Sequence, residues 1–300
     1  MSVLASAMHR SIIASVMFAA TLVAFSMGAG SAAESTNPVL VGAGDIATCG
    51  GAGDEATARL LANIPGTVFT AGDNAYPDGS SHDFLLCYDP SWGRFVARTR
   101  PAVGNHEYET PSASGYFDYF GDAAGPSTRG YYSYDREGWH IVVLNSMCEK
   151  VGGCGTRSPM LDWLRKDLAS SGRACTLAYF HHPLFSSGAH GNQSKMLPAW
   201  KVLYAANVDV VVNGHDHDYE RFAPQRPDGT KDTERGIREF VVGTGGAEHR
   251  PFAEIEPHSQ VRDAKTSGVL KLTLGPDRYD WKFIPVTGQD FTDSGTRVCH

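Results

Sequence analysis

Short runs of apolar residues alternate with segments of helical periodicity along most of the chain. Runs rich in Val, Ile, Leu and aromatic residues, bounded by Gly, Pro, Asn or Asp, are typical of buried strands that meet loops. The predicted strands cover residues 38–45, 67–76, 100–107, 139–146, 175–183 and 208–217. Because helical patterns lie between these runs, the sequence predicts an α/β fold.

Three of the intervening segments carry helix signals. Residues 53–64 and about 83–97 have a helical pattern of apolar positions. In the third segment, Ser158 can cap a helix that begins at Pro159 and ends before Gly172. The apolar face of this third helix consists of Leu161, Leu164 and Leu168.

The last part of the chain is predicted to complete the sheets. Residues 238–246, 268–276 and 279–286 alternate like antiparallel strands, with a turn at 275–277 between the last two. The run GTGG at 243–246 is not followed by Gly-Lys-Ser/Thr, so we interpret it as a close-packed turn and not as a phosphate loop.

Residues 1–33 have the pattern of a cleaved export signal. His9 and Arg10 precede an apolar stretch over about 12–27, and Ser31-Ala32-Ala33 has the form of a signal-peptidase site. A retained membrane anchor is the alternative, because the stretch nearly reaches the roughly 18 residues that a spanning helix needs. The small residues after it favour cleavage. We therefore expect no stable membrane anchor, one domain over 34–300, and a secreted location, extracellular or periplasmic.

The net charge of the chain indicates which kinds of partner it can bind. The formal net charge is −7, which argues against a basic surface for nucleic acid. A small anionic substrate would have to be attracted by a local site. The sequence gives no indication of an oligomeric state.

Six cysteines fit an exported, oxidised chain. Cys148 and Cys154 have the spacing of a local loop disulfide, and no Cys-x-x-Cys motif is present. Six cysteines allow fifteen connectivities. Pairing Cys49 with Cys87 and Cys175 with Cys299 is one of the three pairings that the other four cysteines allow, and the sequence leaves the connectivity open.

Five predicted strands end in residues that bind hard or borderline metals. They are Asp45, Asp73, Asn105-His106, His181-His182, and His215 with His217. The carboxyl ends of strands in an α/β sheet form the usual ligand site, so we expect these groups to meet. Carboxylate, amide and imidazole without thiolate favour hydrolytic manganese, iron or zinc. The surplus over three ligands predicts two ions bridged by a carboxylate.

These residues also carry a family resemblance. The motifs are GD (44–45), GDNAY (72–76), GNHE (104–107), HHP (181–183) and GHDHDYER (214–221). In order and spacing this set resembles the calcineurin-like metallophosphoesterases and, within them, the purple acid phosphatases. The resemblance covers about 39–246. It implies an α/β/β/α sandwich of two mixed sheets flanked by helices.

One departure from the wider superfamily is informative. Many members have His two residues after the first Asp, where this chain has Ala47. The purple branch replaces that ligand with a tyrosine three residues after the second Asp, which here is Tyr76. A free phenol has a pKa of about 10, so binding as phenolate requires a strong Lewis acid. The resemblance therefore implies Fe(III) plus a divalent Zn, Mn or Fe.

The resemblance also assigns roles to individual residues. The metal ligands would be Asp45, Asp73, Tyr76 and His217 for one ion, and Asp73, Asn105, His181 and His215 for the other. His106 and His190 resemble the outer histidines that contact phosphate and protonate the leaving group. Asp216, Asp218 and Glu107 are candidates, by proximity, to accept hydrogen bonds from the ligating imidazoles.

The implied function is a secreted two-metal phosphomonoesterase that uses in-line attack by a metal-bound hydroxide. The same motifs fit a phosphodiesterase or nucleotide pyrophosphatase. A noncatalytic metal- or phosphate-binding protein is a further alternative, although this chain lacks none of the ligands. A serine hydrolase is disfavoured, because no Gly-x-Ser-x-Gly motif is present.

Overall fold

The computed structural model describes residues 37–300. The expected signal peptide, residues 1–33, lies outside the described residues. Between residues 37 and 300, no helix is both long enough and apolar enough to cross a bilayer.

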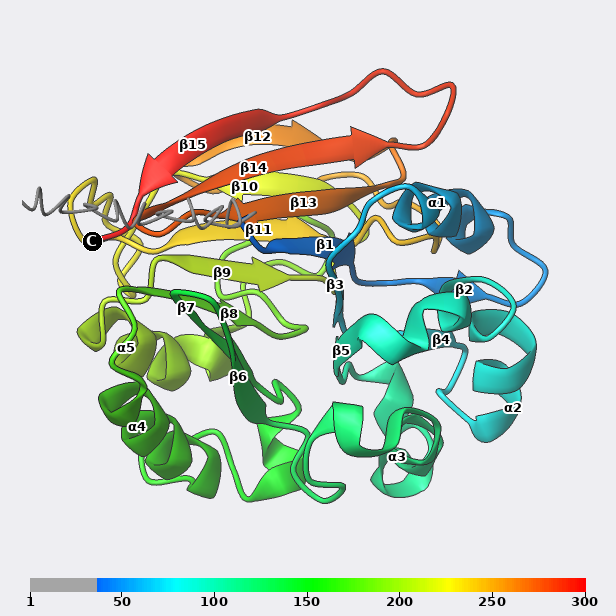
Figure 1. Ribbon diagram of the computed structural model, residues 1–300, viewed down its shortest axis with the longest axis horizontal. Helices are drawn as coiled ribbons and strands as arrows, with labels where there is room; N and C mark the ends of the chain where they lie inside the picture. The colour runs from blue at the N-terminus through cyan, green and yellow to red at the C-terminus, as the bar shows by residue number, and fades with distance from the viewer. Residues whose placement is uncertain (1–36) are drawn as a thin grey trace, which may run out of the picture. The chain divides into compact units, whose positions relative to one another are not determined.

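The first sheet has six strands in the order β15-β14-β13-β1-β3-β5 (Figure 1). Their bounds are β1 Val39–Ala43, β3 Thr67–Ala71, β5 Thr99–Ala102, β13 Gly268–Leu274, β14 Arg278–Pro285 and β15 Ser294–Val298. Strands β1, β3 and β5 are parallel. Strands β13, β14 and β15 continue the sheet as antiparallel neighbours beyond β1.

The second sheet has seven strands in the order β12-β10-β11-β9-β8-β7-β6. Their bounds are β6 Tyr132–Arg136, β7 Trp139–Val143, β8 Cys175–Tyr179, β9 Val210–Asn213, β10 Tyr219–Phe222, β11 Arg238–Val242 and β12 Ser259–Asp263. Strands β7, β8, β9 and β11 are parallel, and the remaining pairings are antiparallel. Both sheets are therefore mixed. A short pair, β2 (Ala47–Thr48) and β4 (Ala75–Tyr76), lies outside them.

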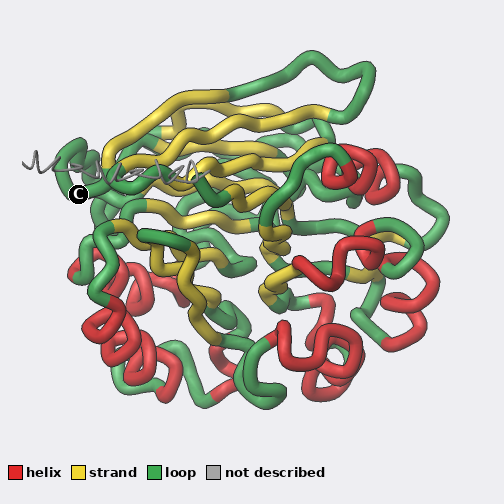
Figure 2. Tube along the Cα trace, in the orientation of Figure 1, coloured by secondary structure: helices red, strands yellow, loops and turns green. Residues whose placement is uncertain are grey.

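Helices flank both sheets (Figures 1 and 2). Their bounds are α1 Gly53–Ala62, α2 Ser81–Asp83, α3 Ser114–Phe120, α4 Pro159–Ser171 and α5 Leu197–Ala205. The helix predicted at about 83–97 is irregular: α2 continues as a π-helical turn over Phe84–Tyr88, and a 3₁₀ helix covers Trp92–Arg98.

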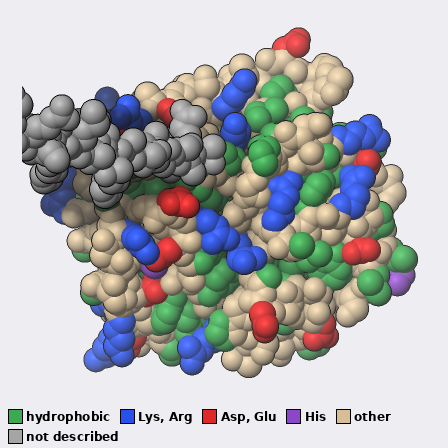
Figure 3. All heavy atoms as spheres, in the orientation of Figure 1, with side chains coloured by type: hydrophobic (Ala, Val, Ile, Leu, Met, Phe, Trp, Pro, Cys, Tyr) green, Lys and Arg blue, Asp and Glu red, His purple; other side chains and the backbone are tan. Residues whose placement is uncertain are grey.

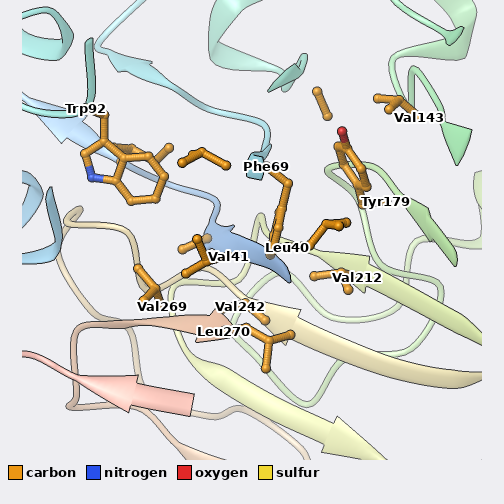
Figure 4. Close-up of a cluster of buried hydrophobic side chains, with 14 of the residues drawn as sticks. Leu40, Val41, Phe69, Trp92, Val143, Tyr179, Val212, Val242, Val269 and Leu270 are labelled. Carbon is orange, nitrogen blue, oxygen red and sulfur yellow. The ribbon is translucent and has the colours of Figure 1, made fainter. Parts of the chain in front are cut away.

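Alternating side chains divide the core into two layers. In β9, Val210 and Val212 belong to the cluster between the sheets, while Val211 packs in a second cluster with Leu164 of α4 and Trp200 of α5. Figure 4 shows Val212 in one cluster of buried side chains with Leu40 of the first sheet. This period of two is the geometry of a pleated strand buried on both faces. The expected α/β/β/α sandwich is confirmed.

Two local predictions are confirmed. Ser158 caps α4 by accepting a hydrogen bond from the Leu161 backbone N–H, and Gly172 ends the helix in the left-handed conformation. The cysteines are oxidised, as expected, in the disulfides Cys49–Cys87, Cys148–Cys154 and Cys175–Cys299.

One strand prediction was wrong in orientation. Strand β11 was expected among antiparallel strands, yet it pairs parallel with β9 and antiparallel with β10. The reason is strand β10, which the sequence analysis missed. It lies between β9 and β11 in the sequence but pairs with β11 on the side away from β9.

Acidic and basic side chains are interspersed on the face of the molecule in Figure 3, and hydrophobic side chains occur there in small groups. Mixed charge of this kind is ordinary for a soluble surface.

Candidate metal centre

The ends of the parallel strands bring the predicted site residues to one edge of the sandwich. Hydrogen bonds join the two sheets there: the Gly44 N–H donates to the Val242 carbonyl at 2.9 Å, and the His181 ring donates from Nδ1 to the Ala71 carbonyl at 2.8 Å. Residues that follow β1, β3 and β5 of the first sheet therefore face residues that follow β8 and β9 of the second.

The backbone is strained at three of these positions. Asp45, Asp73 and His215 have φ angles of 58°, 48° and 74°, in the left-handed region that non-glycine residues rarely adopt. Such conformations concentrate at functional sites, where the surrounding structure holds them. Gly104 is required for a different reason, because a Cβ there would overlap the Asp73 carboxylate.

Four side chains form the Tyr76 cluster. The Tyr76 Oη lies 3.0 Å from Asp45 Oδ1, 3.3 Å from Asp73 Oδ2 and 3.2 Å from His217 Nε2. His217 Nε2 is also 3.3 Å from Asp45 Oδ1. All four side chains are buried.

Four side chains form the His181 cluster. His181 Nε2 lies 3.1 Å from Asp73 Oδ2, 3.1 Å from Asn105 Oδ1 and 3.3 Å from His215 Nδ1. Asn105 and His215 are partly exposed, so this cluster is the one nearer to solvent.

The two clusters share one atom, Oδ2 of Asp73. Ligand atoms bound about 2.0–2.2 Å from one ion stand about 3 Å apart at neighbouring positions, and the distances within both clusters are of that size. Asp45, Asp73 and His181 also form a buried group whose ligand atoms could hold one metal ion. The donor spacing and the oxygen and imidazole chemistry fit two cations that share Asp73.

The charges within the clusters shift several pKa values. Burial works to raise the pKa of Asp73, but the adjacent His181 reverses the effect and leaves the pKa lowered. Burial works to lower the pKa of His181, and Asp73 outweighs it, raising that pKa to about 9. Burial, with Asp45 and Asp73 nearby, raises the pKa of Tyr76 well above its ordinary value. Without a bound cation, the phenol is therefore protonated near neutral pH.

The acceptors that orient the imidazoles are backbone carbonyls and not the expected acids. His181 Nδ1 donates to the Ala71 carbonyl at 2.8 Å, and His217 Nδ1 to the Glu248 carbonyl at 2.7 Å. These bonds turn both Nε2 atoms toward the clusters. The expectation that Asp216, Asp218 or Glu107 would do this was wrong.

Glu107 instead holds the loops that carry the clusters. Its two carboxylate oxygens accept hydrogen bonds from the backbone N–H groups of Asp73 (3.1 Å), Asn74 (2.6 Å) and Gly104 (2.7 Å). Burial, followed by the charge of Asp73, raises the pKa of Glu107 to about 7.

Asp216 holds the loop that carries His190. It accepts hydrogen bonds from the Ser186 hydroxyl at 2.5 Å and the His190 backbone N–H at 2.7 Å. Asp218 is fully buried, and its carboxylate has no hydrogen-bond partner among residues 37–300.

The two outer histidines contact different members of the clusters. His106 contacts the Tyr76 ring, with centroids 4.4 Å apart, and its Nε2 lies 3.9 Å from Asp73 Oδ2. The exposed His190 stacks on the His215 ring at 4.4 Å. Together they border both clusters. His182, the neighbour of His181, bonds to the Ser146 hydroxyl at 2.8 Å instead.

Arg250 is a site residue that the sequence analysis missed. Its Nη1 donates to His190 Nε2 at 2.7 Å. Arg250 follows β11 by eight residues and belongs to no motif considered above, so only the folded chain brings it to the site.

Comparisons of the sequence with known proteins give several matches. The family model described as calcineurin-like phosphoesterase matches residues 30–219. Purple acid phosphatase 15 of Arabidopsis thaliana is 29% identical over 200 residues, covering 54% of this chain and 37% of that protein. The Fe(3+)-Zn(2+) purple acid phosphatase 12 of the same plant is 30% identical over 178 residues, covering 51% and 36%. The chain thus spans well under half the length of these two relatives.

Solved structures share the fold. A purple acid phosphatase from yellow lupin seeds (Lupinus luteus) matches with a TM-score of 0.69 and 20% identity, over 88% of this chain and 54% of that one. GAP50, described as the anchor in the inner membrane complex of Plasmodium, matches with a TM-score of 0.65 and 13% identity, over 88% and 90%. At these identities the likeness shows the fold alone.

Proposed function

Because the chain belongs to the calcineurin-like phosphoesterase family, we propose that it hydrolyses phosphomonoesters at a centre of two metal ions. One ion would bind the Tyr76 cluster and the other the His181 cluster. The observation that carries the proposal is the shared Asp73 Oδ2, which lies 3.3 Å from Tyr76 Oη and 3.1 Å from His181 Nε2. A carboxylate shared by two clusters of metal-binding side chains fits two cations held close together, as in two-metal phosphoesterases.

The ligand chemistry supports a mixed-valence pair. Tyr76 in the first cluster favours Fe(III), because a phenolate needs a strong Lewis acid. The second cluster offers Asn105, His181 and His215, which suit Zn, Mn or Fe(II). A relative whose name specifies Fe(3+) and Zn(2+) supports the same pair.

When bound, the two cations would neutralise the phosphoryl oxygens and lower the pKa of a coordinated water. The protein's own residues contribute orientation and proton transfer. The Asp73 carboxylate accepts the His106 backbone N–H at 3.0 Å and so fixes that histidine beside the clusters. His106 would donate to the substrate phosphate, and His190, whose ring stacks on His215, would protonate the leaving oxygen.

Export fits the cysteine chemistry. Three disulfides persist in oxidising compartments and are rare in the cytosol. We therefore propose that the chain acts outside the cell or in the periplasm after removal of residues 1–33, as a single domain over 34–300.

The test is metal content and turnover of Asp73→Ala and His217→Ala. Asp73→Ala removes the shared ligand, so we expect loss of both ions and a fall in p-nitrophenyl phosphate hydrolysis of about 1000-fold, equal to about 4 kcal/mol. His217→Ala should deplete one ion. His82→Ala removes an exposed imidazole and serves as the matched control.

Each outcome separates the alternatives. Full activity with normal metal content in Asp73→Ala would refute the two-metal proposal. A wild-type protein that binds both ions but hydrolyses neither p-nitrophenyl phosphate nor its bis ester would be a noncatalytic metal-binding protein. Preference for the bis ester would identify a phosphodiesterase.

A further inference from the structure

Arg250 places a guanidinium beside the candidate metal centre. Its Nη1 lies 2.7 Å from His190 Nε2, and the His190 ring stacks on His215 with centroids 4.4 Å apart and an interplanar angle of 26°. The guanidinium therefore contacts an imidazole that itself contacts His215 of the His181 cluster. Since arginine can only donate, His190 Nε2 is the acceptor of this bond.

The segment that carries Arg250 is held at the site by two backbone hydrogen bonds. Its N–H donates to the His217 carbonyl at 3.3 Å, and the Ala253 N–H donates to the Ser187 carbonyl at 2.9 Å. His217 belongs to the Tyr76 cluster and Ser187 to the loop that carries His190. The backbone at residues 250–253 is thus held next to the metal ligand His217 and the loop that carries His190.

The Arg250 charge is available to a ligand. Its side chain is exposed, and among residues 37–300 no carboxylate lies within 4 Å of it. By contrast, the nearly buried Arg221 is paired with Asp293 at 2.6 Å. A guanidinium carries five N–H donors in a fork that matches phosphate oxygens, and His190 uses one of them.

We propose that Arg250 is a specificity-determining residue that binds a second phosphate on the leaving group of the substrate. The preferred substrates would be compounds with two adjacent phosphates, of which inorganic pyrophosphate is the simplest. This inference rests on the proposed function, because the first phosphate must lie at the two metal ions. Arg250 is on the side of His190, where the leaving group would emerge.

The reaction balances without a further reactant. The oxygen of water forms a bond to one phosphorus, and the bond from that phosphorus to the bridging oxygen breaks. The bridging oxygen leaves with the second phosphate and takes up a proton, so one pyrophosphate and one water give two phosphates. Arg250 would neutralise charge on the departing phosphate, where stabilisation of the transition state lowers the barrier.

The test compares two substrates in the metal-loaded protein. In Arg250→Ala, kcat/KM for pyrophosphate should fall at least tenfold more than kcat/KM for p-nitrophenyl phosphate, which has no second phosphate. Arg250→Lys should recover part of the difference, because it keeps the charge and loses the fork. Inhibition by methylenediphosphonate, relative to inhibition by phosphate, should weaken in parallel.

Arg278→Ala is the matched control, because Arg278 is an exposed arginine at the first position of β14. It should change neither substrate. Equal losses on both substrates in Arg250→Ala, or no loss on pyrophosphate, would overturn the inference. A wild type that hydrolyses p-nitrophenyl phosphate but not pyrophosphate would overturn it too. A wild type that hydrolyses neither would instead refute the proposed function.

Discussion

The proposed preference for a ferric ion depends on a single oxygen, the Oη of Tyr76. It is within 3.3 Å of three other donor atoms of its cluster. In Tyr76→Phe the ring remains while this oxygen is lost. After loading with Fe(III) and Zn(II), we expect the visible tyrosinate charge-transfer band to disappear and ferric affinity to fall about tenfold or more, or about 1.4 kcal/mol. Absorption spectra and iron content measure both effects.

Tyr108→Phe is the control for this substitution. The Tyr108 hydroxyl accepts from Asn145 at 2.8 Å and takes no part in either cluster, so its loss should leave the band intact. A band that persists in Tyr76→Phe would mean that another group binds the ferric ion, or that the colour has another source.

Side chains could be predicted from the sequence where residue type and position at a strand end coincide. Asp45, Asp73 and His181 were identified in this way, and their ligand atoms lie within 4.8 Å of one another. Arg250 could not be identified, because its place depends on how the chain after β11 folds back onto His217. The carbonyl of Glu248 left no signal either, since every residue type carries that acceptor.

At the scale of loops and strands, we expect substitutions at two buried glutamates to have opposite effects on stability. Both oxygens of Glu107 accept backbone N–H groups, from Asn74 and Gly104 among others. In Glu239 one oxygen accepts the Leu184 N–H at 3.0 Å, and the other has no partner within residues 37–300. In Glu107→Gln, one of these accepting oxygens is replaced by an NH₂ group, which cannot accept a hydrogen bond from a backbone N–H. We expect about 2 kcal/mol of destabilisation and at least tenfold weaker metal binding, measured by urea unfolding and metal titration at pH 8.

Glu239→Gln should act in the opposite direction. Burial raises the pKa of Glu239 well above 4.5, so the folded state keeps a proton that the unfolded state releases. Stability contributed by this site therefore falls as the pH rises above about 4.5. Gln lacks that penalty, so the variant should gain stability between pH 5 and pH 8 relative to the wild type. Equal destabilisation of both variants at pH 8 would show that only packing matters.

Elements with local determinants were predictable, and those with distant determinants were not. Helix α4 has its cap, its first proline and its terminal glycine within the segment itself. Strand β10, Tyr219–Phe222, lies inside a motif rich in charged residues, and all four of its residues are buried. Its Glu220 accepts from the Ser187 hydroxyl at 2.6 Å, a distant partner that makes burial of the charge tolerable and that periodicity cannot reveal.

For the molecule as a whole, alternation of strands and helices predicted an α/β fold, but the division into two sheets came from the family resemblance. A buried histidine near the start of β7 joins this strand to β6 and to helix α4, away from the metal centre. His140 Nδ1 lies 2.9 Å from Asp135 of β6, and Nε2 lies 2.8 Å from Asp167 of α4. Arg173 binds the other oxygen of Asp135 at 2.7 Å.

This arrangement predicts how the stability of the molecule depends on pH. Burial works to lower the pKa of His140, but hydrogen bonds to Asp167 and Asp135 outweigh it and leave the pKa raised. The stabilisation is complete below about pH 6.5, the unfolded value, and is lost as the pH rises through the folded value. His140→Gln should thus cost about 1–2 kcal/mol at pH 5.5 and less at pH 9, measured by urea unfolding. His82→Gln, at an exposed site, should show no such trend. A constant deficit in His140→Gln would assign the effect to packing, because lost packing does not titrate.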